Sequence, residues 1–358
     1  MSATFTPRIL ERYVAIDQAC GWPNLTLLPN GDIVTLIWPE PCHGLWEGAA
    51  ECWASTDGGR TWAKRGVPVA HAPGTNRMNL SAGLARDGAL VACVAGWGGR
   101  GPRGTRTSHL GCPTQPPISA RSTDGGRTWE NFATPTAPAA ENRPNYADGP
   151  SYRNADGSPM LTPFGDLWPL PDGTRGVMFY SSRALFYVSP DEGRSWIHRG
   201  NVGEHDATSE TTWLPLPDGR LLAMARTHGD NHLDQFISTD NGLTWKFDQA
   251  VTGAGEHPAG LTALRDGTLL LTYGIRTEAL FGVGVKTSSD RGRTWSQPQV
   301  LVNCEESTNP HDPKPEARDG GYPANVALAD GTIVTAYYCK GVRAHQRYHV
   351  GVIRWRLG

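Results

Sequence analysis

The chain has 358 residues, and its 33 lysines and arginines nearly balance 35 aspartates and glutamates, for a formal net charge of −2 at pH 7. This balance argues against a nucleic-acid-binding protein, which normally carries a basic stripe, and no stretch is apolar enough to span a bilayer. The 43 glycines and 28 prolines are typical of a turn-dense all-β chain.

The cysteines number seven, an odd count, and they show no CxxC spacing. Several fall inside predicted strands, where a free cysteine behaves as a small hydrophobic residue. The first residues lack the apolar core of a signal peptide. Reduced thiols and the absence of this signal predict a cytoplasmic location.

Six hairpin signals recur along the chain, each an Asn-Gly or Asp-Gly pair between two apolar runs. Such a pair between alternating hydrophobic residues is the strongest short-range indication of a β-hairpin. In chain order the six pairs are Asn30-Gly31, Asp87-Gly88, Asp172-Gly173, Asp218-Gly219, Asp266-Gly267 and Asp330-Gly331.

A second repeat, S-x-D-x-G-x-[ST]-W, follows each of the first five hairpins. Its aspartate can accept hydrogen bonds from backbone amides of its own turn, and its glycine accepts a positive φ. Its tryptophan supplies a large apolar plate that can be buried against a neighbouring unit. The five copies run from Ser55 to Trp62, Ser122 to Trp129, Ser189 to Trp196, Ser238 to Trp245 and Ser288 to Trp295.

Together the two repeats predict a unit of four antiparallel strands, with a tight turn between the first two and the Asp motif between the last two. Radial repetition of such units makes a β-propeller. Six hairpins predict six blades in a single domain spanning residues 1–358. The sixth unit lacks an Asp motif, and we expect an N-terminal strand at 9–16 to close it beside a strand at 348–355.

The topology predicts which residues share one face of the ring. The first strand of each unit starts on the face where the second strand ends, and the Asp motifs lie on the opposite face as structural turns. Convergent polar and aromatic groups around a concave centre indicate a binding site. The starts of the first strands offer Trp22, Arg77, Asp166, Trp168, Glu210, His257 and Tyr322, and the ends of the second strands offer Trp38, Trp97, Arg183, Arg226 and Arg276.

Two segments and the Asp motif resemble the sialidase superfamily. The segment from Ser209 to Arg226 is similar to the family's pairing of a glutamate at the start of one strand with an arginine at the end of the next. Gly320-Gly321-Tyr322-Pro323 is similar to the segment that carries the family's tyrosine nucleophile, and the S-x-D-x-G-x-[ST]-W motif resembles its Asp-box. The resemblance extends over the whole chain at the level of the fold.

This resemblance implies that Tyr322 is the nucleophile, that Glu210 is the base that activates it, and that Arg226 binds an anionic group of the substrate. The chemistry is coherent because a phenol is a poor nucleophile until a nearby carboxylate takes its proton. A neutral attacking group also avoids repulsion from a negatively charged sugar, and a guanidinium fork matches a planar carboxylate.

The sequence also departs from the family pattern. Gly21-Trp22-Pro23-Asn24 stands where the family has the first arginine of a three-arginine cluster, which argues against sialic acid itself as the substrate. Arg276 is an approximate match for the third arginine, and Arg77 or Arg183 could replace the missing one. The first-blade loop that carries the family's acid/base aspartate has no aspartate here, so Glu47, with His43 second, is the candidate general acid.

These residues favour an exo-glycoside hydrolase that releases a terminal, acidic sugar, with Trp22, Trp38, Trp97 and Trp168 as stacking surfaces. Long loops at 96–119 and 131–165 would wall the pocket and favour access from a chain end. We expect no cofactor and no metal, although the loop at 228–234 alternates histidine with aspartate. Two alternatives stay open: a uronate-specific polysaccharide lyase that uses Tyr322 and His257, and a non-catalytic carbohydrate-binding propeller.

Overall fold

A computed structural model describes residues 5–107, 112–132, 135–138, 153–203, 208–304, 319–340 and 347–358. Within these ranges every regular element is a β-strand, as the composition predicted. Accordingly, the described residues include no helix that is long and apolar enough to cross a membrane. All seven cysteines are free thiols, and only Cys112 lies outside the buried class.

Four of the sheets contain four antiparallel strands each. The first has the order β2 (Gly21–Leu27), β3 (Ile33–Trp38), β4 (Glu51–Ser55) and β5 (Ala63–Gly66). The second comprises β14 (Thr208–Pro215), β15 (Leu221–Thr227), β16 (Leu233–Ser238) and β17 (Lys246–Ala250). The third comprises β18 (Glu256–Ala263), β19 (Leu269–Arg276), β20 (Phe281–Ser288) and β21 (Gln299–Asn303). The fourth comprises β1 (Pro7–Asp17), β24 (His349–Leu357), β23 (Ile333–Lys340) and β22 (Asp319–Ala327).

A fifth sheet has eight strands, in the order β13-β12-β11-β10-β6-β7-β8-β9. Its strands are β6 (Asn79–Leu84), β7 (Leu90–Trp97), β8 (Thr114–Ser122), β9 (Glu130–Phe132), β10 (Thr162–Pro169), β11 (Arg175–Tyr180), β12 (Ala184–Ser189) and β13 (Ile197–Asn201). Two antiparallel halves meet where β10 pairs in parallel with β6, at Asp166↔Ala82 and Leu167↔Gly83. A Cβ on Gly83 would lie 2.4 Å from the carbonyl oxygen of Leu167, so glycine permits this close approach. The expectation of separate four-stranded sheets is therefore confirmed only in part.

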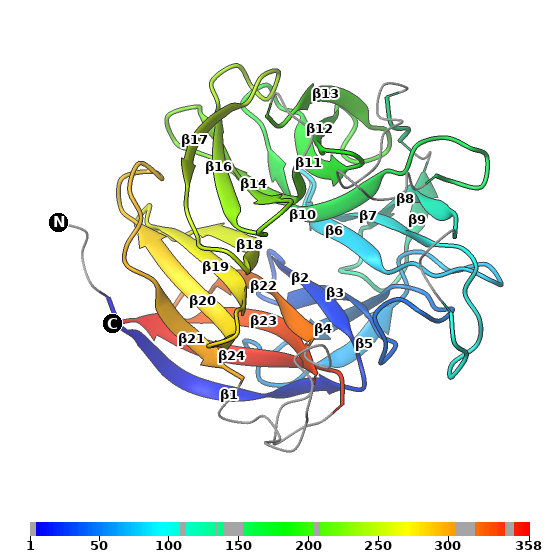
Figure 1. The fold of residues 1–358 in the computed structure, drawn as a ribbon, viewed down its shortest axis with the longest axis horizontal. Coiled ribbons are helices and arrows are strands. Elements are labelled where there is room, and N and C mark those ends of the chain that lie inside the picture. The colour runs from blue at the N-terminus through cyan, green and yellow to red at the C-terminus, as the bar shows by residue number, and fades with distance from the viewer. Residues whose placement is uncertain are drawn as a thin grey trace.

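The sheets form a ring around a common centre, which gives a β-propeller-like fold (Figure 1). Strands β2, β6, β10, β14, β18 and β22 contact one another in succession, and β22 returns to contact β2. The chain ends lie side by side, because β1 pairs antiparallel with β24 from Pro7↔Leu357 to Asp17↔His349. This pairing covers the free edge that β24 would otherwise expose.

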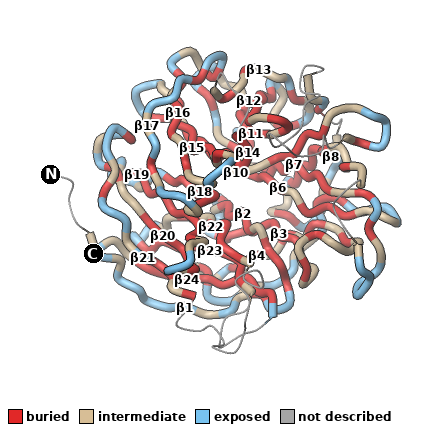
Figure 2. The backbone as a smooth tube through the Cα atoms, viewed as in Figure 1, coloured by how far each residue is buried: buried red, intermediate tan, exposed pale blue. Residues whose placement is uncertain are grey.

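The hydrophobic core is divided into clusters that lie between neighbouring sheets, and Figure 2 shows the buried strands around the centre. The Asp-motif tryptophans contribute to these clusters. Trp196 is 8% exposed, and its Nε1 donates to Ser119 Oγ of the preceding unit at 3.0 Å. Trp295 Nε1 likewise donates to Gln235 Oε1 of the preceding unit at 2.8 Å. Trp196 and Trp295 therefore each join their own repeat unit to the preceding one.

The Asp motif is a self-contained turn, as the copy at 55–62 illustrates. Asp57 Oδ1 accepts hydrogen bonds from the backbone amides of Arg60 at 2.8 Å and Thr61 at 3.0 Å. Its Oδ2 accepts from the Thr61 hydroxyl at 2.6 Å, and Ser55 Oγ donates to Oδ1 at 2.7 Å. These contacts occupy the carboxylate locally, which agrees with the structural role predicted for the motif.

Candidate active site

Five of the six strands around the centre carry an irregularity in their pairing near the predicted site face. A bulge turns a side chain away from the regular alternation of a strand, and bulges are enriched beside functional sites. The register shifts lie between Gly21 and Asn24, Phe164 and Trp168, Thr208 and Thr211, Glu256 and Ala259, and Gly321 and Ala324. The residues inside these bulges include Trp22, Asp166, Glu210, His257 and Tyr322, all of which the sequence placed at the site.

Tyr322, Glu210 and Arg226 form a hydrogen-bonded chain between β22, β14 and β15. The Tyr322 hydroxyl donates to Glu210 Oε1, and Arg226 Nη1 donates to Glu210 Oε2 at 2.7 Å. Asn231 Oδ1 accepts from the same guanidinium, at 3.1 Å from Nε and 2.9 Å from Nη2. Tyr322 is 7% exposed and Glu210 9%, so the hydrogen bond between these two residues is largely shielded from water.

Arg276 lies against the opposite side of Tyr322. Its Nε and Nη2 donate to the carbonyl oxygen of Gly320 at 3.0 and 2.7 Å, and its guanidinium carbon lies 5.2 Å from the centre of the Tyr322 ring. A cation over the ring face is attracted by the aromatic quadrupole. Two predicted substrate-binding arginines, Arg226 and Arg276, are thus brought to the predicted nucleophile.

The environment keeps the Tyr322 phenol protonated at rest. Burial raises the pKa of the phenol, and the negative charge of Glu210 raises the same pKa further, while Arg276 and Arg226 act in the opposite direction. The phenol therefore stays neutral until a reaction removes its proton. Glu210, which already accepts that proton in a hydrogen bond, is positioned to take it.

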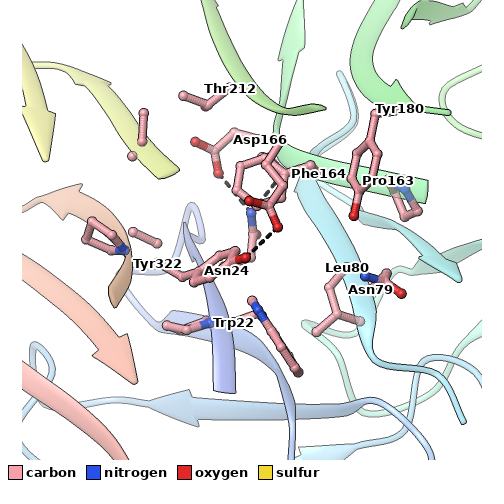
Figure 3. Close-up of a pocket in the computed structure, with 17 residues that line it drawn as sticks. Trp22, Asn24, Asn79, Leu80, Pro163, Phe164, Asp166, Tyr180, Thr212 and Tyr322 are labelled. Atoms are coloured by element: carbon pink, nitrogen blue, oxygen red, sulfur yellow. Dashed lines mark hydrogen bonds between the residues drawn. The ribbon is translucent and has the colours of Figure 1, made fainter. Parts of the chain in front are cut away.

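A small cavity lies beside Tyr322 and extends toward Asp166 (Figure 3). Its volume is about 50 Å³, and its walls include Trp22, Phe164 and Tyr180. Polar groups line the end near β10, where Asn24 Nδ2 donates to Asp166 Oδ1 at 2.9 Å and to the Gly165 carbonyl at 3.0 Å. The cavity is large enough to hold water.

Asp166 titrates in an unusual range for a carboxyl group. Burial raises the pKa of Asp166 to about 7, although the hydrogen bond from Asn24 opposes this shift. An unfolded aspartate loses its proton near pH 3.9. The folded protein therefore binds this proton more tightly than the unfolded chain does, and Asp166 costs stability progressively as pH rises from about 4 to about 7.

Replacing Asp166 with asparagine should remove this pH dependence. We expect the melting temperature of Asp166→Asn, measured relative to wild type, to increase by a few degrees between pH 5 and pH 8. The raised pKa costs about 1.4 kcal/mol per pH unit between about pH 4 and 7, and about 1 kcal/mol shifts the melting temperature of a 358-residue chain by roughly 1–2 °C. Thermal melts at four pH values would measure the difference, with the exposed Glu278→Gln as control. If the difference in melting temperature between the variant and the wild type stayed constant over this pH range, the pKa of Asp166 would not be raised.

His257 lies in the β18 bulge as a neutral imidazole. It is 4% exposed, and its Nδ1 has no hydrogen-bond partner among the described residues. Burial, together with the positive charges of Arg226 and Arg276, lowers the pKa of His257 to about 2. A neutral ring beside two arginines avoids adding a third positive charge to the site.

The two candidates for the general acid lie in different surroundings. Glu47 Oε1 accepts a hydrogen bond from the Gly74 amide at 2.5 Å, so this carboxylate caps a neighbouring turn. His43 Nδ1 lies 2.7 Å from Asp319 Oδ2. Asp319 was not predicted from the sequence, although its position three residues before Tyr322 was an available signal.

Two of the four tryptophans predicted as stacking surfaces are not available at the site, one because it is fully buried and one because it lies beyond the β10 bulge. Trp38 is fully buried, and its Nε1 donates to the Cys42 carbonyl at 2.9 Å, so its ring is part of the core. Trp168 pairs with Gly176 beyond the β10 bulge, toward the Asp-Gly turn, because β10 begins earlier than predicted, at Thr162. Both predictions were wrong.

The other two tryptophans remain at the site end of the ring. Trp22 meets Tyr322 edge to face, with ring centres 6.0 Å apart. Trp97 ends β7, and both Trp22 and Trp97 are partly buried against the cluster that contains Tyr322.

Arg77 and Arg183 are not in the Tyr322 chain. Arg77 is 8% exposed, and its Nη1 donates to the Pro116 carbonyl at 2.9 Å. Arg183 lies in the turn between β11 and β12, where its carbonyl accepts from the Ser181 amide at 3.0 Å. Their contact with a substrate stays a prediction.

Two clusters contain potential metal ligands. In the loop at 228–234, His232 pairs through Nδ1 with Asp230 at 2.5 Å and through Nε2 with Asp234 at 2.9 Å, so these groups satisfy one another. Among the described residues, Cys20, His43 and Asp319 also bring their ligand atoms within 4.8 Å of one another. Burial raises the pKa of the Cys20 thiol well above its usual value.

The β-propeller-like ring and its tyrosine–glutamate–arginine chain define a protein of the sialidase-superfamily type, as the sequence motifs predicted. The BNR repeat-like domain family matches residues 120–335, and the chain belongs to this family.

Two curated relatives are sialidases. The Paraclostridium sordellii protein is 29% identical over 198 residues, which cover 54% of this chain and 48% of the relative. The Bacteroides fragilis protein is 23% identical over 209 residues, which cover 50% of this chain and 36% of the relative. The matched part is thus less than half the length of either relative.

Solved structures support the fold. A protein of unknown function from Dyadobacter fermentans superposes with a TM-score of 0.78 at 20% identity, covering 98% of this chain and 99% of that one. The intramolecular trans-sialidase of Ruminococcus gnavus, solved with oseltamivir carboxylate, superposes with a TM-score of 0.64 at 14% identity and covers 96% of each chain. At these identities the likeness establishes the fold alone.

Proposed function

We propose that the protein is a sialidase-like exo-glycoside hydrolase that releases a terminal, acidic sugar. The observation that carries the proposal is the buried hydrogen bond from Tyr322 to Glu210, made beside two arginines. A buried phenol paired with a carboxylate is the arrangement that an activated tyrosine nucleophile requires. The similarity to proteins named sialidases supports the same chemistry.

In the proposed reaction, the Tyr322 oxygen attacks the anomeric carbon while Glu210 removes the phenol proton. The glycosidic C–O bond breaks as the new bond to Tyr322 forms, which yields a covalent glycosyl-enzyme. Water then attacks the same carbon and releases Tyr322, whose oxygen recovers its proton from Glu210. Transfer of the proton within a preformed hydrogen bond avoids a free, buried phenolate in the resting enzyme.

We propose that the sugar is acidic because Arg226 and Arg276 place two guanidinium groups around the nucleophile. Arg226 would exchange part of its contact with Glu210 for a substrate carboxylate, which a guanidinium binds in a bidentate manner. Trp22 stands where the resembled family has a further arginine, so the carboxylate would meet two arginines and an aromatic wall. This difference favours a sugar acid other than sialic acid.

Two further parts of the proposal concern the number of blades and the access of a substrate to the site. We propose that the two antiparallel halves of the eight-stranded sheet correspond to two blades, which gives six blades in one domain. Long loops would restrict the site to chain ends, but residues 108–111, 133–134 and 139–152 of these loops lie outside the described residues.

The test is a panel of 4-nitrophenyl and natural glycosides of sialic acid, other nonulosonic acids and uronic acids. Release of a saturated free sugar, followed by NMR, supports the hydrolase. An unsaturated product absorbing in the ultraviolet would instead identify a lyase, and binding without turnover would identify a carbohydrate-binding propeller. The hydrogen bond of Tyr322 is made to Glu210 rather than to His257, which argues against the lyase.

A further inference from the structure

Asp319, the first residue of β22, accepts three hydrogen bonds. Tyr338 donates its hydroxyl to Oδ1 at 2.6 Å, Tyr348 donates to Oδ2 at 2.7 Å, and His43 Nδ1 lies 2.7 Å from the same Oδ2. The carboxylate thus links the loop after β3 with strands β22 and β23 and with Tyr348, the residue before β24. Three donors on one side chain fix its orientation.

The Asp319 carboxyl is ionised across the physiological range. Burial acts to raise its pKa, but hydrogen bonds from His43, Tyr338 and Tyr348 and the charge of His43 outweigh burial and hold the pKa of Asp319 well below its usual range. A fixed carboxylate that faces Nδ1 of an imidazole orients the ring.

His43 combines this fixed orientation with access to solvent. Its side chain is 44% exposed, whereas that of Asp319 is 20% exposed. Because Nδ1 faces Asp319, the other ring nitrogen, Nε2, is directed away from the carboxylate. The ring also packs edge-on against Trp22 at 4.7 Å, and Trp22 in turn contacts Tyr322 at 6.0 Å. His43 and the nucleophile therefore flank the same indole.

The neighbouring carboxylates of the same loop are already engaged. Glu47 accepts from the Gly74 amide at 2.5 Å, and Glu40 pairs with Arg103 at 3.0 Å. Within the described part of the chain, neither of these two glutamates contacts a charged side chain that lies near Tyr322 and is itself buried. Of the titratable groups described in this loop, His43 is the one that both contacts the site and is oriented by a second ionised side chain.

We propose that His43 is the general acid and base of the reaction and that Asp319 is its positioning residue. This inference rests on the proposed glycoside hydrolase function. In the first step Nε2 donates its proton to the glycosidic oxygen as the C–O bond breaks. The electron pair of the C–O bond moves to that oxygen. In the second step neutral Nε2 takes a proton from water as the water oxygen attacks the anomeric carbon and the bond to Tyr322 breaks.

The test compares two leaving groups on one sugar acid, with sialic acid used first and the best substrate of the panel second. A 4-nitrophenyl group departs without protonation, whereas a methyl or galactosyl group requires it. His43→Gln should lower kcat for the alkyl glycoside by about 10²–10⁴-fold, the usual contribution of a general acid, and that for the aryl glycoside by much less. Asp319→Asn should also lower kcat more for the alkyl glycoside than for the aryl glycoside, but by a smaller factor than His43→Gln. The KM values should change little.

Other variants separate this proposal from the function on which it rests. Tyr322→Phe should slow both substrates alike, because the nucleophile is needed for either leaving group. If His43→Gln lowered kcat equally for the two leaving groups, His43 would not be the general acid, and the proposed hydrolase function would still stand. The same conclusion would follow if Glu47→Gln, rather than His43→Gln, lowered kcat for the alkyl glycoside selectively. Failure of the wild type to hydrolyse any glycoside would overturn both. Circular dichroism and melting temperatures verify that Asp319→Asn is folded.

Discussion

Tyr322→Phe should reduce kcat for the best glycoside of the panel on the order of 10³-fold or more, with a small change in KM. Removal of a nucleophile abolishes the covalent route, and the residual rate then comes from binding and electrostatic stabilisation alone. The phenylalanine ring keeps the contacts with Trp22 and Arg276, so substrate binding should persist. Steady-state kinetics with an aryl glycoside measure the effect directly.

A matched control is Tyr187→Phe, which removes a second buried phenol. The hydroxyl of Tyr187 donates to the Thr136 carbonyl at 2.7 Å within a core cluster away from the Tyr322 chain. Its loss should cost about 1 kcal/mol of stability and leave kcat unchanged. Equal rates for wild type and Tyr322→Phe would refute Tyr322 as the nucleophile.

Glu210→Gln should lower kcat by about 10²–10⁴-fold, the range expected for a proton acceptor. Glutamine has nearly the same shape and can still accept a hydrogen bond from Tyr322, but it cannot take the proton. The change also removes the ionic partner of Arg226, which lies 2.7 Å from Glu210 Oε2. Kinetics on the same aryl glycoside, with thermal melts to verify folding, measure the result.

Glu210→Asp provides the comparison, because it keeps the charge and shortens the reach by one methylene. We expect Glu210→Asp to retain a higher kcat than Glu210→Gln. If Gln instead remained within about tenfold of wild type, proton transfer to residue 210 would contribute little, and Glu210 would serve only as the structural partner of Arg226.

The sequence predicted the repeat architecture because the fold is built from local turns. Each Asp-Gly pair and each Asp motif determines its hairpin through contacts within a few residues, as the hydrogen bonds of Asp57 illustrate. Tyr322 and Glu210 are 112 positions apart, and only the resemblance to a known family brought them together. Their hydrogen bond was then a specific prediction of that resemblance.

The features that the sequence did not predict depend on contacts between repeat units that are far apart in the chain. His43 and Asp319 are 276 positions apart, and they become neighbours only because the sheet containing β22 closes the ring against β2. The parallel pairing of β6 with β10 depends on the close approach that Gly83 allows. Trp168 was misplaced because a bulge changes the register of β10, and bulges have no simple sequence signal.

The central claim is that Tyr322 forms a covalent bond with the sugar, and a mechanism-based trap tests it most directly. The wild type would be incubated with 2,3-difluorosialic acid, and with the corresponding fluorinated fluoride of the sugar acid that it hydrolyses best, before peptide mass spectrometry. We predict a single glycosyl adduct on the peptide that contains Tyr322, and none in Tyr322→Phe. An adduct on Glu210 or on any other residue, or hydrolysis with inversion at the anomeric carbon, would contradict the account.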